Sequence, residues 1–548
     1  MDFRSAARFA TLLTKAKAHR APGKRKLPIG IQTFRELREE GYYYVDKTPM
    51  IAQLAEEGKF YFLARPRRFG KSLFLDTLAE AFAGNQHLFE GLYLEHHWDW
   101  SRRRPVVRIS FAEGVLNSQE ALRQRILYIL RANAEQLGVT CSAQDPTTCL
   151  MELLERASRQ WGERVVVLVD EYDKPILDNL TSPETARQMR DELRGFYSVL
   201  KGQDAYLRFV FLTGVTKFSK VSLFSGLNNL YDLTLDPAYA TICGYTEADL
   251  HEVFAPEIKR FNILDVRRWY NGYQWLGEPV YNPFDVLMLF KSGEFRTWWF
   301  ETGTPTFLVN WLAERQFPTH RLESLYADDA LLSTFDVDGI SVEAMLWQTG
   351  YLTIRDRHQE GTRWTYVLSL PNLEVRSALN GELFAHWYLR DRAKTSRLNT
   401  ALYNLIQQND LDGMRQHFER LYASIPSDWY RSTPLAHYEG YYASVFYSHL
   451  AALGLELIAE DVSNKGRCDL AVLFGDRVYL FEFKVVAGKQ ATGEALAQLK
   501  ARDYAAKYRA DGRVVYLIGV EFSESLRQVV GWECVADRDI YKHTLQEG

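Results

Sequence analysis

Two groups of charged residues in this 548-residue chain have the types and spacing needed to hold phosphate groups and metal ions. The first lies in the stretch Tyr61 to Leu75, YFLARPRRFGKSLFL, where four apolar residues enter a turn and Gly70-Lys71-Ser72 opens a helical pattern. Backbone N–H groups at the N-terminus of such a helix face an anion. Lys71 would reach the β- and γ-phosphates of a nucleotide, and the Ser72 hydroxyl would bind Mg²⁺. The alternative is an ordinary helix start, because Arg65 stands where the general motif has its first glycine.

An acidic motif follows further along the chain, at the end of the run Arg164 to Glu171, RVVVLVDE. Five consecutive apolar and mostly β-branched residues predict a strand that is buried on both faces, as in a parallel sheet. Asp170 at the strand end would hold Mg²⁺, and Glu171 would polarise the attacking water. The alternative is a buried strand with a solvated acidic end.

The predicted strand Leu207 to Thr213 also ends in polar residues. In ATPases with a phosphate loop, a polar side chain at this strand end senses the γ-phosphate, which makes Thr213 or Thr216 a candidate. A cap or turn residue is the alternative for each. The predicted nucleotide contacts are therefore Arg65, Arg67, Arg68, Phe69, Gly70, Lys71, Ser72, Asp170 and Thr213.

A different chemistry is indicated near the C-terminus. Asp469 begins an apolar strand, and the next strand, Val478 to Val486, carries Glu482 and Lys484. Side chains alternate along a strand, so Glu482 and Lys484 share one face with apolar residues. A glutamate and a lysine on such a core-like strand are unfavourable unless they are paired or bound to a metal.

Cleavage of a phosphodiester bond needs this set of side chains. Asp469 and Glu482 are hard oxygen ligands for Mg²⁺, or for Mn²⁺, and the Phe483 carbonyl is a candidate third ligand. A metal bound there would lower the pKa of a water molecule, and Lys484 would position that water or stabilise the pentavalent phosphate. The alternative is a buried Asp–Lys or Glu–Lys pair that stabilises a hairpin.

Composition narrows the class of protein. Apolar residues make up 47% of the chain and charged residues 25%, which is ordinary for a globular protein. Because the net charge is −4, any contact with nucleic acid must come from local basic patches. No apolar run approaches the ~18 residues of a membrane span, so no membrane partner is expected. Five scattered cysteines without metal-ligand spacing indicate a reducing, cytoplasmic location.

Helical and strand patterns supply the elements that must position these groups. One long helical region is predicted from Ser118 to Gln160, and a single helix from Glu494 to Arg509. A helix at Ser341–Gly350 precedes two short strands, Tyr351–Arg355 and Trp364–Leu370. A helix followed by a two-stranded wing is consistent with a winged-helix module, for which structural packing is favoured over reading of DNA.

Six motifs of this chain resemble those of the prokaryotic AAA-ATPase-like family. They are YYYVDKTPMI, RPRRFGKS, LVDEYDKP, LTGVTKFSKVSLFSGLNNLYDLTLD, YNGY (Tyr270–Tyr273) and VYNPFDVL (Val280–Leu287). Members usually carry a PD-(D/E)XK nuclease-like domain at the C-terminus, and the resemblance covers nearly the whole chain after residue 27. The family shares the non-glycine start at Arg65. Three roles stay open for the loop arginines: phosphate contacts, pairs with Asp173 or Asp178, or fingers acting in trans in a homo-oligomer.

Three further residues take roles that the resemblance implies. Glu439 matches the leading acidic residue of the nuclease-like domain, and Gln498 and Tyr504 match the QxxxxxY signature of its recB-like subset. On one continuous helix Gln498 and Tyr504 would point to different sides, because six residues turn about 600°. The predicted catalytic set is Glu171, Asp469, Glu482, Lys484, Glu439, Gln498 and Tyr504.

The expected fold class is α/β. It consists of a P-loop NTPase core with a parallel sheet, a helical and winged-helix-like lid, and a C-terminal PD-(D/E)XK (restriction-endonuclease-like) α/β domain. The predicted domains are a basic, flexible leader at 1–27, an AAA-like P-loop ATPase core at 28–255, a lid and winged-helix-like region at 256–375, a helical connector at 376–430 and a nuclease-like domain at 431–548.

These features predict an enzyme that binds and hydrolyses ATP and cleaves nucleic acid with Mg²⁺, with DNA favoured over RNA. A setting in prokaryotic genome maintenance or phage defence rests on the family alone. Two alternatives are a nucleotide-switched signalling protein and a DNA-remodelling ATPase, each with a C-terminal fold that binds nucleic acid without cleaving it.

Overall fold

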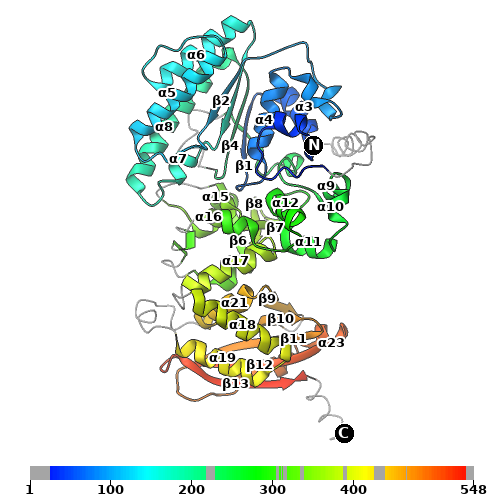
Figure 1. Ribbon diagram of the computed structural model, residues 1–548. Coiled ribbons are helices and arrows are strands. Elements are labelled where there is room, and N and C mark those ends of the chain that lie inside the picture. The colour runs from blue at the N-terminus through cyan, green and yellow to red at the C-terminus, as the bar shows by residue number, and fades with distance from the viewer. Residues whose placement is uncertain are drawn as a thin grey trace. The chain divides into compact units, whose positions relative to one another are not determined.

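The computed structural model (Figure 1) describes residues 25–217, 229–303, 308–309, 311–312, 317–333, 339–386, 392–424, 439–463 and 466–537. The chain divides into two compact units. The first unit comprises Met1–Gly303 and Tyr326–Asn372, and the second comprises Thr304–Leu325 and Leu373–Gly548. The predicted leader lies outside the described residues as far as residue 24.

The first unit is built on a five-stranded parallel sheet in the order β2-β3-β4-β1-β5. Every residue of β1 is buried, as are the five apolar residues of β3, which is why these strands are continuously apolar rather than alternating. The predicted parallel sheet is confirmed. Because β4 lies between β1 and β3, the carboxyl ends of these three strands adjoin. The strands are β1 Phe60–Ala64, β2 Val106–Ser110, β3 Val165–Asp170, β4 Leu207–Gly214 and β5 Tyr231–Asp232.

Helices cover both faces of this sheet. Figure 1 shows α5, α6 and α8 together on one side and α3 and α4 on the other. The helix that follows β1 is α4, and α7 follows β3, so both begin at the carboxyl edge of the sheet. The helices are α2 Phe34–Glu39, α3 Thr48–Glu57, α4 Lys71–Phe82, α5 Gln119–Gln136, α6 Pro146–Trp161, α7 Lys174–Leu177 and α8 Pro183–Gly202.

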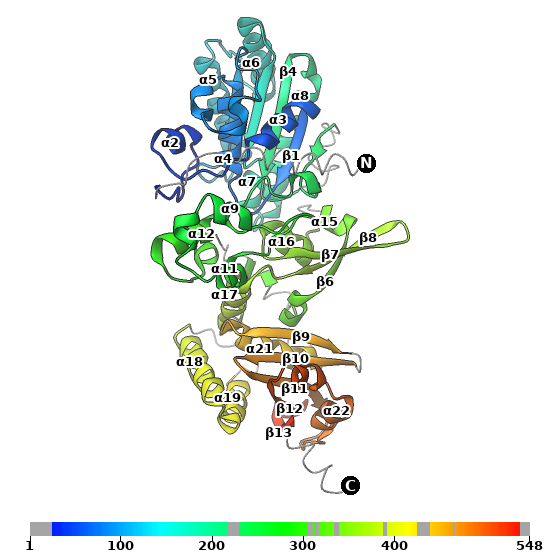
Figure 2. The same ribbon diagram turned by 90° about the vertical axis from the view of Figure 1, so that its right-hand side faces the viewer.

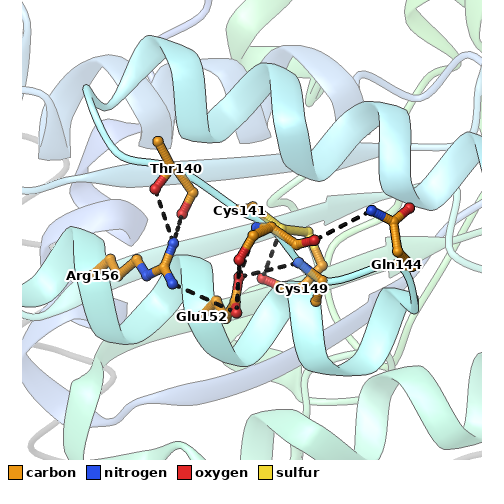
Figure 3. Close-up of polar contacts among 8 residues, drawn as sticks. Thr140, Cys141, Gln144, Cys149, Glu152 and Arg156 are labelled. Atoms are coloured by element: carbon orange, nitrogen blue, oxygen red, sulfur yellow. Dashed lines mark hydrogen bonds and ion pairs between the residues drawn. A yellow bond between two sulfur atoms is a disulfide. The ribbon is translucent and has the colours of Figure 1, made fainter.

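A disulfide between Cys141 and Cys149 joins the loop after α5 to the first turn of α6 (Figure 3). The carboxylate of Glu152 accepts the Ser142 N–H at 2.8 Å, and Arg156 donates to the Thr140 carbonyl at 2.6 Å. The predicted helical region from Ser118 to Gln160 therefore consists of two helices, α5 and α6, which this loop separates. No pairing of the five cysteines was expected from the sequence, and the structure joins these two.

Helices rich in aromatic residues follow the sheet within the first unit. They share a core in which Tyr43 and Val45 pack with Phe254, Tyr270 and Phe290. Figure 2 shows β7 and β8 as a long hairpin beside α16, in the arrangement that the helix and two strands predicted. A third strand, β6, borders β8. These elements are α9 Glu247–Glu252, α10 Ala255–Ile258, α11 Ile263–Tyr270, α12 Pro283–Ser292, α13 Trp298–Gly303, β6 Leu325–Asp328, α15 Asp329–Ser333, α16 Val342–Thr349, β7 Thr353–Glu360 and β8 Arg363–Ser369.

The second unit contains a mixed five-stranded sheet in the order β13-β12-β11-β10-β9. Strands β11 and β12 are parallel, and the other neighbours are antiparallel. The strands are β9 Glu456–Ser463, β10 Gly466–Phe474, β11 Arg477–Val486, β12 Val514–Ser523 and β13 Gln528–Ala536. The helices are α17 Leu373–Phe384, α18 Arg392–Gln408, α19 Leu411–Ala423, α21 Glu439–Ala452, α22 Glu494–Arg502 and α23 Ala506–Ala510.

Alternation along β11 lets two helices pack on opposite faces of this sheet. Phe481 and Phe483 pack against Phe446 of α21, with ring centroids 5.8 and 5.1 Å away. On the other face, Val478 and Leu480 share a core with residues of α22. The predicted division of β11 into two faces is thus confirmed for these apolar residues.

The predicted helix Glu494–Arg509 is interrupted. Helix α22 ends at Arg502, and Asp503 adopts a left-handed backbone conformation with φ +45° before α23 begins. Tyr504 therefore does not lie six residues along the same helix as Gln498, and the geometric expectation that the two point to different sides is wrong.

No helix among the described residues is both long and apolar enough to cross a membrane.

Two buried histidines in the second unit predict a stability that depends on pH. The Nε2 atoms of His417 and His449 lie 3.1 Å apart, so one ring must donate and the other accept, and the two rings cannot both be protonated. Burial lowers the pKa of His417 to about 4 and that of His449 well below its ordinary value.

Since the unfolded chain binds more protons below about pH 6.5, the free energy of unfolding should fall as the pH drops from there toward 4. For His417 the loss at pH 5 is about 2 kcal/mol. Urea denaturation of wild type and of the His417→Gln/His449→Gln variant, from pH 7 to pH 5, checks this. The variant should show a shallower decline, and parallel curves would contradict the prediction.

Candidate nucleotide and nuclease sites

The loop between β1 and α4 has the geometry of an anion-binding turn. Gly70 caps α4 with φ +96°, a left-handed conformation that glycine adopts without strain. Lys71 and Ser72 are the first residues of the helix, so the backbone N–H groups of its first turn face the loop. The predicted strand, loop and helix are thus present in the predicted order.

Lys71 lies at the centre of this loop and is only 7% exposed. Its ammonium donates hydrogen bonds to the carbonyls of Arg65 and Pro66, both at 2.9 Å. Burial lowers the pKa of Lys71, and the negative charges of Asp170 and Glu171 oppose that change. The structure therefore brings the loop lysine and the two acidic residues at the end of β3 into one electrostatic environment.

Asp170 is the last residue of β3, and its carboxylate accepts the N–H of Glu171 at 3.0 Å. Glu171 has φ +50°, which is strained for a residue with a side chain and is a feature of functional sites. Burial raises the pKa of Glu171, while the positive charge of Lys71 lowers it. The backbone therefore leaves the strand conformation at Glu171, directly after the aspartate.

Arg65, predicted to contact the nucleotide, is 1% exposed and is held by protein groups. Its guanidinium donates to the carbonyls of Ala64 and Thr234, both at 2.9 Å, and lies 4.2 Å from the centroid of the Trp275 ring. Burial lowers the pKa of Arg65 to about 10. These contacts show why an arginine can replace the first glycine of the motif, because its side chain anchors the loop to the protein interior.

Arg67 and Arg68 are exposed, unlike Arg65. The guanidinium of Arg68 lies 4.0 Å from the centroid of the Phe284 ring. The loop arginines do not make the contacts proposed with Asp173 and Asp178: Asp173 accepts hydrogen bonds from Thr216, and Asp178 forms an ion pair with Lys174 at 2.6 Å.

Aromatic residues brace the loop. The Phe69 ring is buried and lies 4.7 Å from the Tyr273 ring and 5.5 Å from the Trp275 ring, centroid to centroid. The indole of Trp299 donates to the Arg67 carbonyl at 3.1 Å. The YNGY motif that ends at Tyr273 therefore contributes to the shape of the loop, a role that its sequence alone did not indicate.

Thr213 and Thr216, the two sensor candidates, differ in their hydrogen bonds. The Thr213 hydroxyl donates to the Leu63 carbonyl of β1 at 2.9 Å. The Thr216 hydroxyl donates to Asp173 at 2.6 Å, and the same carboxylate accepts the Val215 N–H. Asp173 is fully buried, burial raises its pKa, and it ties the turn after β3 to the end of β4. From the sequence, only a pairing with a loop arginine was expected for Asp173.

The C-terminal acids lie where two strands of the second sheet separate. Strands β10 and β11 pair from Phe474–Arg477 up to Leu470–Phe481. Asp469 and Glu482 are the next residues on each strand beyond the last pair. The carboxylate of Asp469 then bridges to β11 by accepting the Phe483 N–H at 2.8 Å. The predicted acids are thus neighbours at the fork of the sheet.

Glu482 is 1% exposed and has two polar partners from the predicted set. The amide of Gln498 on α22 donates to its carboxylate, and the ammonium of Lys484 lies 3.6 Å away. Burial raises the pKa of Tyr504, the charge of Glu482 raises it further, and a hydrogen bond with Gln498 lowers it. The interruption of the helix after Arg502 lets Gln498 and Tyr504 meet on the same side.

The residues present suit a hard divalent cation. Asp469 and Glu482 offer carboxylate oxygens on adjacent strands, and the Phe483 carbonyl belongs to the same fork. Glu439 begins α21, and its side chain lies outside the described part. Among the described residues no three of His, Cys, Asp and Glu are grouped so as to hold a metal ion.

Comparisons with known proteins agree with the family resemblance of both the N-terminal and the C-terminal part of the chain. A family model described as "Predicted AAA-ATPase" matches residues 28–224, and a model of the PD-(D/E)XK nuclease superfamily matches residues 437–532. The chain is also similar to a protein of Azotobacter chroococcum mcd 1 named "Uncharacterized protein in vnfD 5'region". The two are 56% identical over 510 residues, which cover 93% of this chain and 98% of the relative.

Replacement of Lys71 should remove nucleotide binding. Lys71→Ala deletes the cation that faces the loop carbonyls, so we expect ATP affinity to fall by about a hundredfold or more. Calorimetric titration of ATP·Mg²⁺ measures the change, with Lys259→Ala as the control because Lys259 is exposed. Equal affinity of wild type and the Lys71 variant would exclude this loop as the phosphate site.

Glu171→Gln should separate binding from hydrolysis. The amide keeps the shape of the side chain but cannot accept a proton, so we expect binding close to wild type and a hydrolysis rate lower by about 10² to 10⁴. A phosphate-release assay run beside the titration measures both quantities. Asp191→Asn, on the exposed surface of α8, is the control. Hydrolysis at the wild-type rate in Glu171→Gln would rule out this residue as the base.

Proposed function

Because the chain belongs to the prokaryotic AAA-ATPase-like family whose members carry a C-terminal PD-(D/E)XK nuclease-like domain, we propose that it hydrolyses ATP and cleaves nucleic acid with a divalent metal ion. The nucleic acid is DNA rather than RNA, and nucleotide state controls the cleavage. The observation that carries the cleavage step is the fork at which Asp469 and Glu482 meet, with Lys484 and Gln498 on the buried glutamate.

At the nucleotide site, each residue has a separate task. Lys71, which donates to the Arg65 and Pro66 carbonyls in the structure, would bind the β- and γ-phosphates. Ser72 and Asp170 would hold Mg²⁺, which would neutralise charge on the phosphates. Glu171, directly after β3, would accept a proton from the attacking water. Thr213 lies at the adjacent strand end, where the γ-phosphate would be sensed.

The loop arginines divide between two tasks. Arg65 shapes the loop from within, since its guanidinium is committed to carbonyls and the Trp275 ring. Arg67 and Arg68 are exposed and supply positive charge to phosphate, either in the same chain or to a neighbouring copy in a homo-oligomer. Gly70 and Phe69 contribute backbone geometry: Gly70 by its left-handed cap and Phe69 by its aromatic anchor.

At the nuclease site, Asp469 and Glu482 would hold Mg²⁺ or Mn²⁺, together with Glu439, which begins α21. A metal ion bound there would supply an activated water and stabilise charge on the phosphate. Lys484, 3.6 Å from Glu482, would position that water or bind a phosphate oxygen. Gln498 fixes the orientation of Glu482, and Tyr504 fixes Gln498.

A second candidate function is favoured by one observation. The described residues hold no ready group of three metal-ligating side chains. A protein whose nuclease fold binds nucleic acid without cutting it, and whose ATPase drives a switch or remodels DNA, would not need one. For either candidate, a setting in prokaryotic genome maintenance or phage defence is proposed by analogy with the family alone.

A digestion assay separates the two candidates. Purified protein is incubated with linear, circular and single-stranded DNA and with RNA, in Mg²⁺ or Mn²⁺, with and without ATP. We expect metal-dependent cleavage that responds to ATP. Glu482→Ala and Lys484→Ala should each lower the rate by about a hundredfold or more. Lys489→Ala, at an exposed lysine of the same unit, is the control. Intact substrates under every condition would leave the non-cleaving candidate.

A further inference from the structure

A cavity of about 160 Å³ opens beside the fork of the second sheet. Asp469, Leu470 and Phe483 line it from β10 and β11, and Tyr447 lines it from α21. Its remaining wall includes His320, which precedes the nuclease-like match by more than a hundred positions in the sequence. The cavity is large enough for several water molecules, and so for a group of the size of one phosphodiester.

His320 is held in place by its own short helix, η5 Thr319–Glu323. The Thr319 hydroxyl lies 2.7 Å from the Ser448 hydroxyl of α21. At the other end of η5, Glu323 forms an ion pair with Arg376 at 2.8 Å. The hydrogen bond of Thr319 to α21 and the ion pair of Glu323 with α17 hold the two ends of this helix. His320 lies between them and therefore has a defined position.

One of the two ring nitrogens of His320 has a hydrogen-bond partner. Its Nδ1 lies 3.0 Å from the Ser444 hydroxyl of α21. Within the described part of the chain, no hydrogen bond of its Nε2 is found. Burial lowers the pKa of His320 to about 4, so the ring is neutral at pH 7 and its Nε2 can donate or accept one hydrogen bond.

Backbone strain marks the same cavity. Glu460 lines it and has φ +51°, although it lies inside strand β9. The neighbouring pairs Cys468–Asp461 and Leu470–Ala459 place Glu460 opposite Asp469. A strained residue with a side chain persists only where its surroundings enforce it, and such residues cluster at functional sites. The backbone conformation of Glu460 is a separate observation from the volume of the cavity and from the position of His320.

We propose that His320, which lines the cavity beside the fork, contacts the phosphodiester group of a nucleic-acid strand bound at Asp469 through Nε2, the ring nitrogen that does not contact Ser444. The inference rests on the proposed function and adds a residue from outside the nuclease-like region to its substrate site. The ligand is the phosphate of the strand itself, and Ser444 is a positioning residue that orients the ring.

Binding and cutting are measured separately. Anisotropy of a short fluorescein-labelled single-stranded DNA, with Ca²⁺ in place of Mg²⁺ to suppress cleavage, reports binding. The digestion assay reports cutting. His320→Ala should weaken binding by about tenfold or more, because a hydrogen bond to a charged phosphate is lost. His320→Gln should recover part of it, since the amide can still donate. His386→Ala, at an exposed histidine of the same unit, is the control, and melting temperatures verify folding.

The outcomes distinguish the inference from the proposed function. Cutting by wild type, with unchanged binding and cutting in His320→Ala, would overturn the inference and leave the nuclease. Binding that is lost in His320→Ala and partly restored in His320→Gln, with no cutting by any protein, would support the inference and overturn the cleavage step. Absence of both binding and cutting in wild type would overturn both.

Discussion

One buried ammonium constrains the architecture of the first unit. An uncompensated cation inside a protein is strongly unfavourable, and at Lys71 two loop carbonyls and the negative charges after β3 offset that penalty. This compensation requires β1, β3 and β4 to end at the same edge, which the parallel order supplies. It also requires a loop that does not collapse, and the aromatic contacts of Phe69 and the Trp299 indole hold the loop open in one shape.

The second unit instead buries an acidic side chain, that of Glu482. Glu482 lies on a strand whose neighbouring residues, Phe481 and Phe483, fill an apolar core. Its charge is accommodated because the strands part beside it, which admits Gln498 from α22 and Lys484 from the same strand. Both units therefore place a buried charge beside the point where the pairing of two neighbouring strands ends, β1 with β4 in the first unit and β10 with β11 in the second.

Local patterns predicted the strands and the phosphate loop because each depends on a short run of residues. The buried run of β3 and the glycine before Lys71 specify their conformations without help from distant parts. Contacts across long sequence separations were not predictable. The burial of Arg65 depends on Thr234 and Trp275, and the meeting of Gln498 with Tyr504 depends on a helix break at Asp503. Periodicity over Glu494–Arg509 carries no sign of that break.

The geometry of Glu482 also bears on whether its lysine is a structural partner. A stabilising buried ion pair needs close, hydrogen-bonded geometry, because the desolvation of both charges must be offset. Glu323 and Arg376 of the same unit meet that requirement at 2.8 Å. Glu482 and Lys484 are 3.6 Å apart, beyond the range of a charge-assisted hydrogen bond. Apolar residues would serve a purely structural strand better than this pair, so the stability of the strand alone does not explain why the pair is there.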